Sequence, residues 1–147
     1  MLITFQDDDD GTGELAVRAE NRDFAGRGAA YFSIEQLEEF ARSLLQFPLN
    51  EPKVGIAGGY WSAKRDATLD QELLGIDVYP ISSRGQLGIQ VRVATDQWEG
   101  DRPELHQSAK LELRTTYEGL KKLSKDLLEL IEGKLREVEF VGEDLGH

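Results

Sequence analysis

The chain has no cysteine, only two histidines among its 147 residues, and no long hydrophobic run. Without cysteine it can form neither disulfides nor thiolate metal sites, and two histidines equip it poorly for nucleophilic catalysis or a zinc centre. No stretch of about 18 apolar residues occurs that could span a membrane. The opening residues, MLITFQDDDD, lack the basic and apolar segments of a signal peptide. We therefore expect a cytoplasmic protein with no membrane association, no metal, no cofactor and no catalytic residues.

Basic residues are also scarce, because 17 Lys and Arg stand against 28 Asp and Glu, which gives a formal net charge of −11. Such a field repels nucleic acids and anionic membranes and attracts a basic protein partner. Apolar residues make up 39% of the chain, enough for a hydrophobic core, and the length fits a single domain over residues 1–147. Within it, residues 134–147 are predicted to be a loosely attached tail or a short edge strand.

Two segments, 33–47 and 116–130, have the pattern of capped amphipathic helices. Ser33 with Gln36 three residues later matches a capping box, and Thr116 stands at the same place in the second segment. Apolar residues then recur at helical spacing on one face. They are Ile34, Leu37, Phe40, Ala41, Leu44 and Leu45 in the first segment, and Tyr117, Leu120, Leu123, Leu127, Leu128 and Ile131 in the second.

Pro48 and Gly133 are expected to end these helices. At matching positions the helices carry opposite charges, namely Glu38 and Glu39 against Lys121 and Lys122. If the helices are antiparallel neighbours, we expect these groups to face each other across the pair.

The other segments alternate apolar and polar residues as half-buried strands do. The clearest are LGIQVRVAT from Leu87 and AKLELRT from Ala109, and a further short strand is expected at 138–140. Gly58-Gly59 predicts a bulge, and SSRGQ at 82–86 predicts a hairpin turn. Because strands with one polar face belong to antiparallel sheets, we predict an α+β fold. Its single twisted antiparallel sheet of about six to seven strands would carry both helices on one face.

Asp7–Asp10 before Gly11 resembles part of a calcium-binding loop. With Gly11 at the sixth position of an EF-hand, however, the first and twelfth positions are Gln6 and Val17, which supply no carboxylate. We therefore predict a polar turn between two strands.

His106 and His147 share no ligand spacing, so they predict no metal site. The letters G-x-G-x-x-A from Gly11 match a nucleotide-binding motif, but they open an alternating strand where that motif needs a helix.

The segment TDQWEGDRPE at 95–104 is the candidate binding site, because it is a long acidic connection between two well-patterned strands. Exposed Trp and Arg are favoured at interfaces, and loops carry function more often than strands do. The candidate partner-binding residues are Asp96, Trp98, Glu99, Asp101, Arg102 and Glu104. The alternative is that Trp98 folds back against the end of the sheet. Tyr60 and Trp61 form a second aromatic pair, for which packing at the core or an edge is the favoured interpretation.

Three segments in this order, YFSIEQLEEFARSL, LGIQVRVATD and LELRTTYEGLKKLSKDLLEL, resemble the WapI-like immunity proteins of bacteria and related uncharacterised bacterial families. The resemblance covers most of the chain, through element order and apolar periodicity. It implies a toxin-binding partner protein with no catalytic residues, and the charge of −11 is similar to what neutralising a basic toxin would favour.

We therefore predict a non-enzymatic interaction domain that binds a basic protein through an acidic surface. Two alternatives stay open. One is a small-molecule-binding domain that uses the space between sheet and helices, with Tyr60, Trp61 or Tyr79 as lining. The other is an enzyme whose carboxylates form no recognisable motif.

Overall fold

The computed structural model describes residues 1–49, 52–63 and 68–143. In chain order the elements are β1 Leu2–Asp7, β2 Thr12–Asn21, β3 Phe24–Ser33, α1 Ile34–Ser43, β4 Val54–Trp61, β5 Leu69–Pro80, β6 Gln86–Ala94, the 3₁₀ helix η1 Pro103–Leu105, β7 Ser108–Thr116, α2 Tyr117–Ile131 and β8 Val138–Glu139. The predicted α+β class is confirmed.

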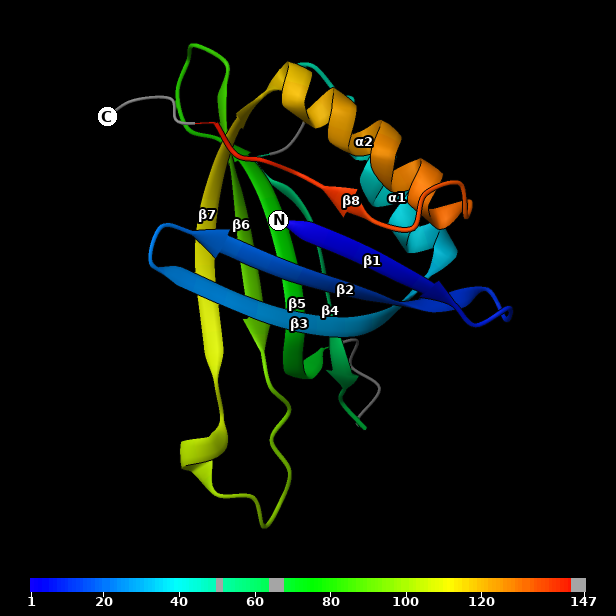
Figure 1. Cartoon of the computed structure of the whole chain (residues 1–147), viewed down its shortest axis with the longest axis vertical. Helices are drawn as coiled ribbons and strands as arrows, with labels where there is room; N and C mark the ends of the chain where they lie inside the picture. Colours follow the sequence, from blue (N-terminus) through cyan, green and yellow to red (C-terminus); the bar gives the residue numbers. More distant parts are fainter. Residues whose placement is uncertain (50–51, 64–67, 144–147) are drawn as a thin grey trace.

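The strands form two antiparallel sheets of four strands each, so the prediction of a single sheet is wrong. Sheet A has the order β3-β2-β1-β8, and sheet B has the order β4-β5-β6-β7. In Figure 1 the strands of sheet A cross those of sheet B, and the two helices lie beside sheet A. The error has a physical cause, because alternation along a strand shows that one face is buried but not what covers it. The apolar face of sheet B is shared by helices and sheet A.

Small side chains on β3 allow the two sheets to approach closely. Gly26, Gly28 and Ala30 occupy successive inward positions of β3, and this strand contacts all four strands of sheet B. A Cβ atom added at Gly28 would lie 2.5 Å from the Leu73 carbonyl oxygen and 2.8 Å from Cβ of Val93. Since ordinary contacts of this kind are longer than 3.4 Å, the crossing requires glycine at this position.

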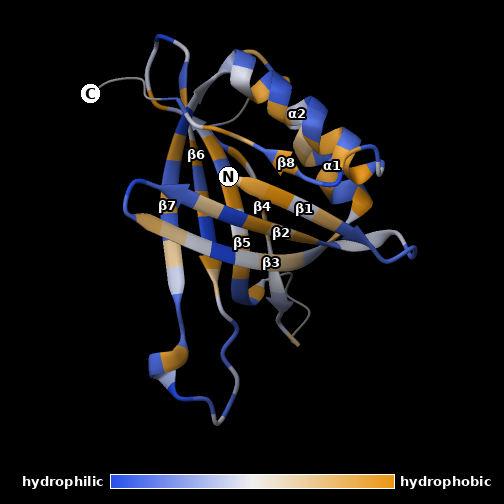
Figure 2. Cartoon of the chain, viewed as in Figure 1, coloured by the Kyte–Doolittle hydropathy of each residue, from blue (hydrophilic) through white to orange (hydrophobic). Residues whose placement is uncertain are grey.

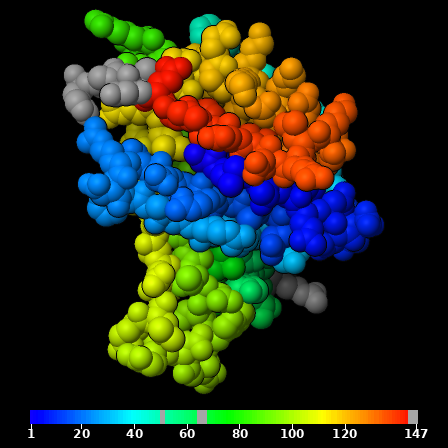
Figure 3. All heavy atoms as spheres, in the orientation of Figure 1, coloured from blue at the N-terminus to red at the C-terminus, as the bar shows by residue number. Residues whose placement is uncertain are grey.

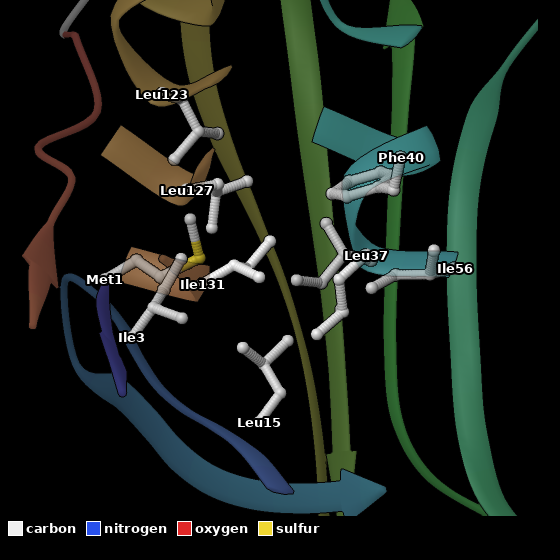
Figure 4. A pocket seen from close by; sticks show the side chains of 10 residues that line it. Met1, Ile3, Leu15, Leu37, Phe40, Ile56, Leu123, Leu127 and Ile131 are labelled. Carbon is white, nitrogen blue, oxygen red and sulfur yellow. The ribbon is translucent and has the colours of Figure 1, made fainter. Parts of the chain in front are cut away.

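The core lies where both sheets and both helices meet, and side chains fill it (Figure 4). The cavity left there measures about 10 Å³, which is at most the space of one water molecule. Its lining is apolar and consists of Met1, Ile3, Leu15, Leu37, Phe40, Ile56, Ile76, Leu123, Leu127 and Ile131. The predicted lining residues of a small-molecule site between sheet and helices are not among them.

The predicted helix starts are confirmed. Ser33 and Gln36 form a capping box on α1, and the Thr116 hydroxyl accepts a hydrogen bond from the Gly119 N–H on α2. Gly133 follows α2 with a φ of 81°, as a helix-ending glycine does. The end of α1 was predicted too late, because the helix stops at Ser43 and not near Pro48. Neither helix of the described residues is long and apolar enough to cross a membrane.

The two helices contact each other through small groups. The buried Ser124 hydroxyl of α2 donates to the Ala41 carbonyl of α1 at 2.6 Å. The predicted charge pairing across the helices is wrong, because the helical ion pairs in the described part of the chain run along one helix, from Arg42 to Glu38 and from Lys122 to Asp126. Glu39, Lys121 and Lys122 are exposed to solvent.

The chain beyond α2 contains one short edge strand, β8, within the described residues. β8 pairs with β1, and both Val138 and Phe140 are buried. The Phe140 N–H donates to the Met1 carbonyl at 2.8 Å. A short edge strand of the kind expected at 138–140 is present at Val138–Glu139, and residues 144–147 lie outside the described residues.

Candidate functional site

The connection between β6 and β7 projects from the body of the protein (Figures 1 and 3). We call residues 95–107 the β6–β7 loop. It contains η1, all its residues are exposed, and it is mostly hydrophilic (Figure 2). All six predicted binding residues lie on it, so the structure gathers them in one place at the surface.

Trp98 is held in a defined position although its side chain is 49% exposed. Its backbone N–H donates to the Asp101 carboxylate at 2.9 Å, and its indole N–H donates to the Asp96 carboxylate at 3.0 Å. Its ring meets the Tyr60 ring edge-on, with centroids 4.6 Å apart. Trp98 is therefore partly folded back, because one part of its ring packs on Tyr60 of β4 and the rest faces solvent.

The base of the loop is fastened to the sheet by amide hydrogen bonds. The Gln71 side chain on β5 makes two, donating to the Gln97 carbonyl at 2.7 Å and accepting from the Gln97 N–H at 2.8 Å. The Thr95 N–H donates to the Gln107 carbonyl at 2.9 Å, and the Thr95 hydroxyl accepts from the Gln107 N–H at 2.9 Å. These bonds extend the β6–β7 ladder and hold the loop in one orientation.

The acidic residues of the loop have different roles. Asp96 and Asp101 shape the loop around Trp98, and Glu104 lies 3.7 Å from Arg102 in an exposed ion pair. Glu99 makes no hydrogen bond or ion pair with the described residues. Glu99 is therefore the loop acid whose charge can be removed with the least change in loop structure.

Tyr31 of β3 extends the aromatic surface next to the loop. Its side chain is exposed, and the nearby carboxylates of Glu14 and Asp8 raise its pKa, with Tyr60 contributing. Trp61 is also exposed. The sequence had favoured packing of Tyr60 and Trp61 at the core or at an edge. Both lie on edge strand β4, near its exposed end, and neither is in the core.

A polar network on the outer face of sheet B escaped the sequence analysis. The Arg92 guanidinium makes two hydrogen bonds to Glu72, at 2.9 and 3.0 Å, one to Asp77 at 2.7 Å and one to Gln90 at 3.0 Å. The hydrogen bonds to Glu72 raise the pKa of Arg92. Gly75 pairs with Arg92 across the strands and leaves room for the guanidinium to lie flat. With every partner satisfied, the network is a structural element of the exposed face.

The sequence signal of the Arg92 network was the presence of opposite charges on two neighbouring strands. These charges can be paired only once the register of the strands is known.

The weaker motifs form no site in the described residues. Asp7 and Asp10 accept backbone hydrogen bonds from Asp9 and Thr12, which shapes the predicted polar turn. No group of three or more metal-ligating side chains occurs in the described ranges. His106 is exposed at the end of η1, and the terminal histidine lies outside these ranges.

An open polar groove of about 1230 Å³ lies between the β2–β3 hairpin, β7 and the C-terminal segment. Its lining includes both acidic and basic side chains, among them Glu20, Arg18, Glu112, Arg114 and Glu139. Its mixed charge and open shape favour no particular ligand.

Comparison with protein-family models, with curated proteins and with solved structures finds no match to this chain.

Proposed function

We propose that this chain is a non-enzymatic protein-binding domain that takes a basic partner at the β6–β7 loop, with Trp98 as the anchor. The observation that carries the proposal is that the Trp98 ring is half exposed while its backbone N–H and indole N–H are both held by carboxylates. A large side chain fixed before binding loses little conformational freedom on association. Tryptophan is also among the residues most often found at binding hot spots.

The charge around Trp98 supports a basic partner. Four carboxylates, at Asp96, Glu99, Asp101 and Glu104, lie near it on the same loop, with Arg102 as the one residue of fixed positive charge there. The chain as a whole carries −11, so a cationic partner would be drawn toward it and its association accelerated. The specific form we propose is an immunity-type protein that neutralises a basic toxin, as the resemblance to WapI-like proteins implies.

The small-molecule alternative has less support, because the core is filled and Tyr60 and Trp61 lie at the surface. Tyr79 lies on the outer face of sheet B, beside the Arg92 network. A gene for a large toxin next to the gene for this chain would add support of an independent kind.

The proposal is tested by capturing partners from the source organism with wild-type protein and with Trp98→Ala. For a captured partner, association and dissociation rates are then measured over a series of salt concentrations. We expect Glu99→Gln to slow association and Trp98→Ala to speed dissociation by about thirtyfold, the equivalent of about 2 kcal/mol.

Leu45→Ala and Glu35→Gln are the matched controls, because both residues are exposed and lie on or just after α1, away from the loop and from β3. They should leave both rates unchanged. A partner that binds Trp98→Ala as tightly as wild type, or at a rate indifferent to salt, would overturn the proposal.

A further inference from the structure

The outer edge of β3 carries backbone groups that have no partner in the described part of the chain. The Ile34 N–H donates to the Gly11 carbonyl at 2.9 Å, in line with the β2–β3 register. Because hydrogen bonding alternates along an antiparallel strand, the even-numbered residues of β3 bond to β2. The N–H and C=O groups of the odd-numbered residues therefore point away from sheet A. These residues are Ala25, Arg27, Ala29 and Tyr31.

The other sheet edges in the described ranges are interrupted or covered. β8 is only two residues long, and β4 has two register shifts. On β7 the Asn21 side chain donates to the Glu112 carbonyl at 2.6 Å, and the Glu143 N–H donates to the Arg114 carbonyl at 2.8 Å. β3 is ten residues long, has no register shift, contains no proline and carries one charged side chain, that of Arg27. Proteins usually protect long sheet edges with bulges, proline, charged side chains or a covering segment. Because β3 has only Arg27 of these, its open edge can pair with another strand.

Sheet B continues past this edge and forms a floor beneath it. Gly26 of β3 lies against Val93 and Ala109, and the next pair along β6 and β7 toward the loop is Thr95 with Gln107. That pair is about 7 Å further on, at about 3.3 Å per residue. The space beside β3 is therefore bordered on one side by the free backbone groups of β3 and underneath by the uncharged polar side chains of Thr95 and Gln107. Figure 3 shows the resulting step between β3 and the β6–β7 loop.

A second copy of the chain does not fit this step. Antiparallel pairing of two β3 strands places a two-fold axis perpendicular to sheet A. Both copies of sheet B would then lie in one layer, and because sheet B and its loop extend beyond β3 (Figure 1), they would overlap. A single extended segment is thin enough to fit.

We infer that an extended, basic segment of a partner protein adds to sheet A as a fifth strand along β3. This inference rests on the proposed function and adds a binding mode to it. Backbone hydrogen bonds to Ala25, Arg27, Ala29 and Tyr31 hold the segment. The loop carboxylates and the exposed Trp98 ring, at the end of the step, favour Lys or Arg there.

The test is a titration of ¹⁵N-labelled protein with an acetylated, amidated ten-residue peptide of alternating Lys and Thr, followed by NMR. We expect saturable shifts of the amide signals of Arg27, Ala29 and Tyr31. Ala29→Pro removes one edge donor without touching a β2–β3 bond, and it should weaken binding about tenfold, whereas Ala29→Val keeps the donor and should stay within about twofold.

A peptide of alternating Lys and Pro has the same charge but cannot pair as a strand, and it needs no protein variant. Equal edge shifts with this peptide, shifts confined to the β6–β7 loop, or no shifts at all would overturn the inference. Repeating the titration with Trp98→Ala separates the two proposals. Edge shifts that persist unchanged would refute the role of the loop and leave strand addition standing.

Discussion

Replacing Gly28 by alanine tests the close crossing of the two sheets on which the fold depends. The new Cβ would lie 2.5 Å from the Leu73 carbonyl oxygen and 2.8 Å from Cβ of Val93. Neither neighbour can rotate away, because one is backbone and the other is a branched side chain on a central strand. Relief would require β3 to move outward by about 1 Å, which would loosen its packing on sheet B.

Two opposing effects determine the size of the change. Gly→Ala restricts the unfolded chain and by itself stabilises a protein by about 0.4–1 kcal/mol. Overpacking a tight core contact costs about 1–3 kcal/mol and sometimes more. The contact is with backbone, so we place its cost at the upper end and expect a net loss of about 2 kcal/mol. For a chain of this length that corresponds to a fall in melting temperature of about 4–8 °C.

The assay is urea unfolding followed by circular dichroism, together with a thermal melt. Ala29→Val is the control, since Ala29 is the next residue of the same strand and its side chain points to the outer face of sheet A. A Gly28→Ala protein as stable as wild type, or more stable, would refute this account of the sheet crossing.

Three further predictions concern the core, the polar network and the outer face. Leu44→Ala should lower the free energy of unfolding by about 2–5 kcal/mol, because the Leu44 side chain is only 1% exposed. Leu45 is 53% exposed, so Leu45→Ala should change the free energy by less than about 0.5 kcal/mol. Equal losses for the two variants in urea unfolding would contradict this. Arg92→Lys keeps the charge but loses the two-point contact with Glu72, and we expect a loss of about 1 kcal/mol. An Arg18→Lys control, at an exposed ion pair, should not reproduce this loss. Burial, followed by the charge of Glu112, raises the pKa of Tyr79 above its usual 10.0. The folded state then holds this proton more tightly than the unfolded state, so its contribution is complete below pH 10 and is lost as pH rises toward the folded pKa. Tyr79→Phe should flatten the decline of stability above pH 10, and an unchanged slope in urea unfolding at several pH values would count against it.

Local features of the fold could be read from the sequence because their causes lie within a few residues. The Ser33 capping box, the glycine after α2 and the hairpin turn at 82–86 depend on backbone bonds between near neighbours. Strand alternation likewise identified which side chains of β6 and β7 are buried. Leu45 fitted the helical stripe yet is exposed, because α1 had already ended and the chain turns away from the core.

The candidate site was predictable in position but not in structure. Loop length and composition located residues 95–104. The carboxylate that holds each N–H of Trp98, and the contact of its ring with Tyr60, depend instead on where the loop lies against β4 and β5.

The sequence by itself determined the class of the fold, the helix starts, most strands and the acidic loop, because periodicity and capping are local properties. Tertiary structure alone decided that the strands divide into two sheets, that Arg92 meets Glu72 and Asp77, and that β3 keeps an open edge. A period of two residues shows which side of a strand is buried, but it is the same whether a helix or another sheet covers that side. The choice between them was made by long-range packing, in which the absence of Cβ atoms at Gly26 and Gly28 lets one sheet cross directly over the other.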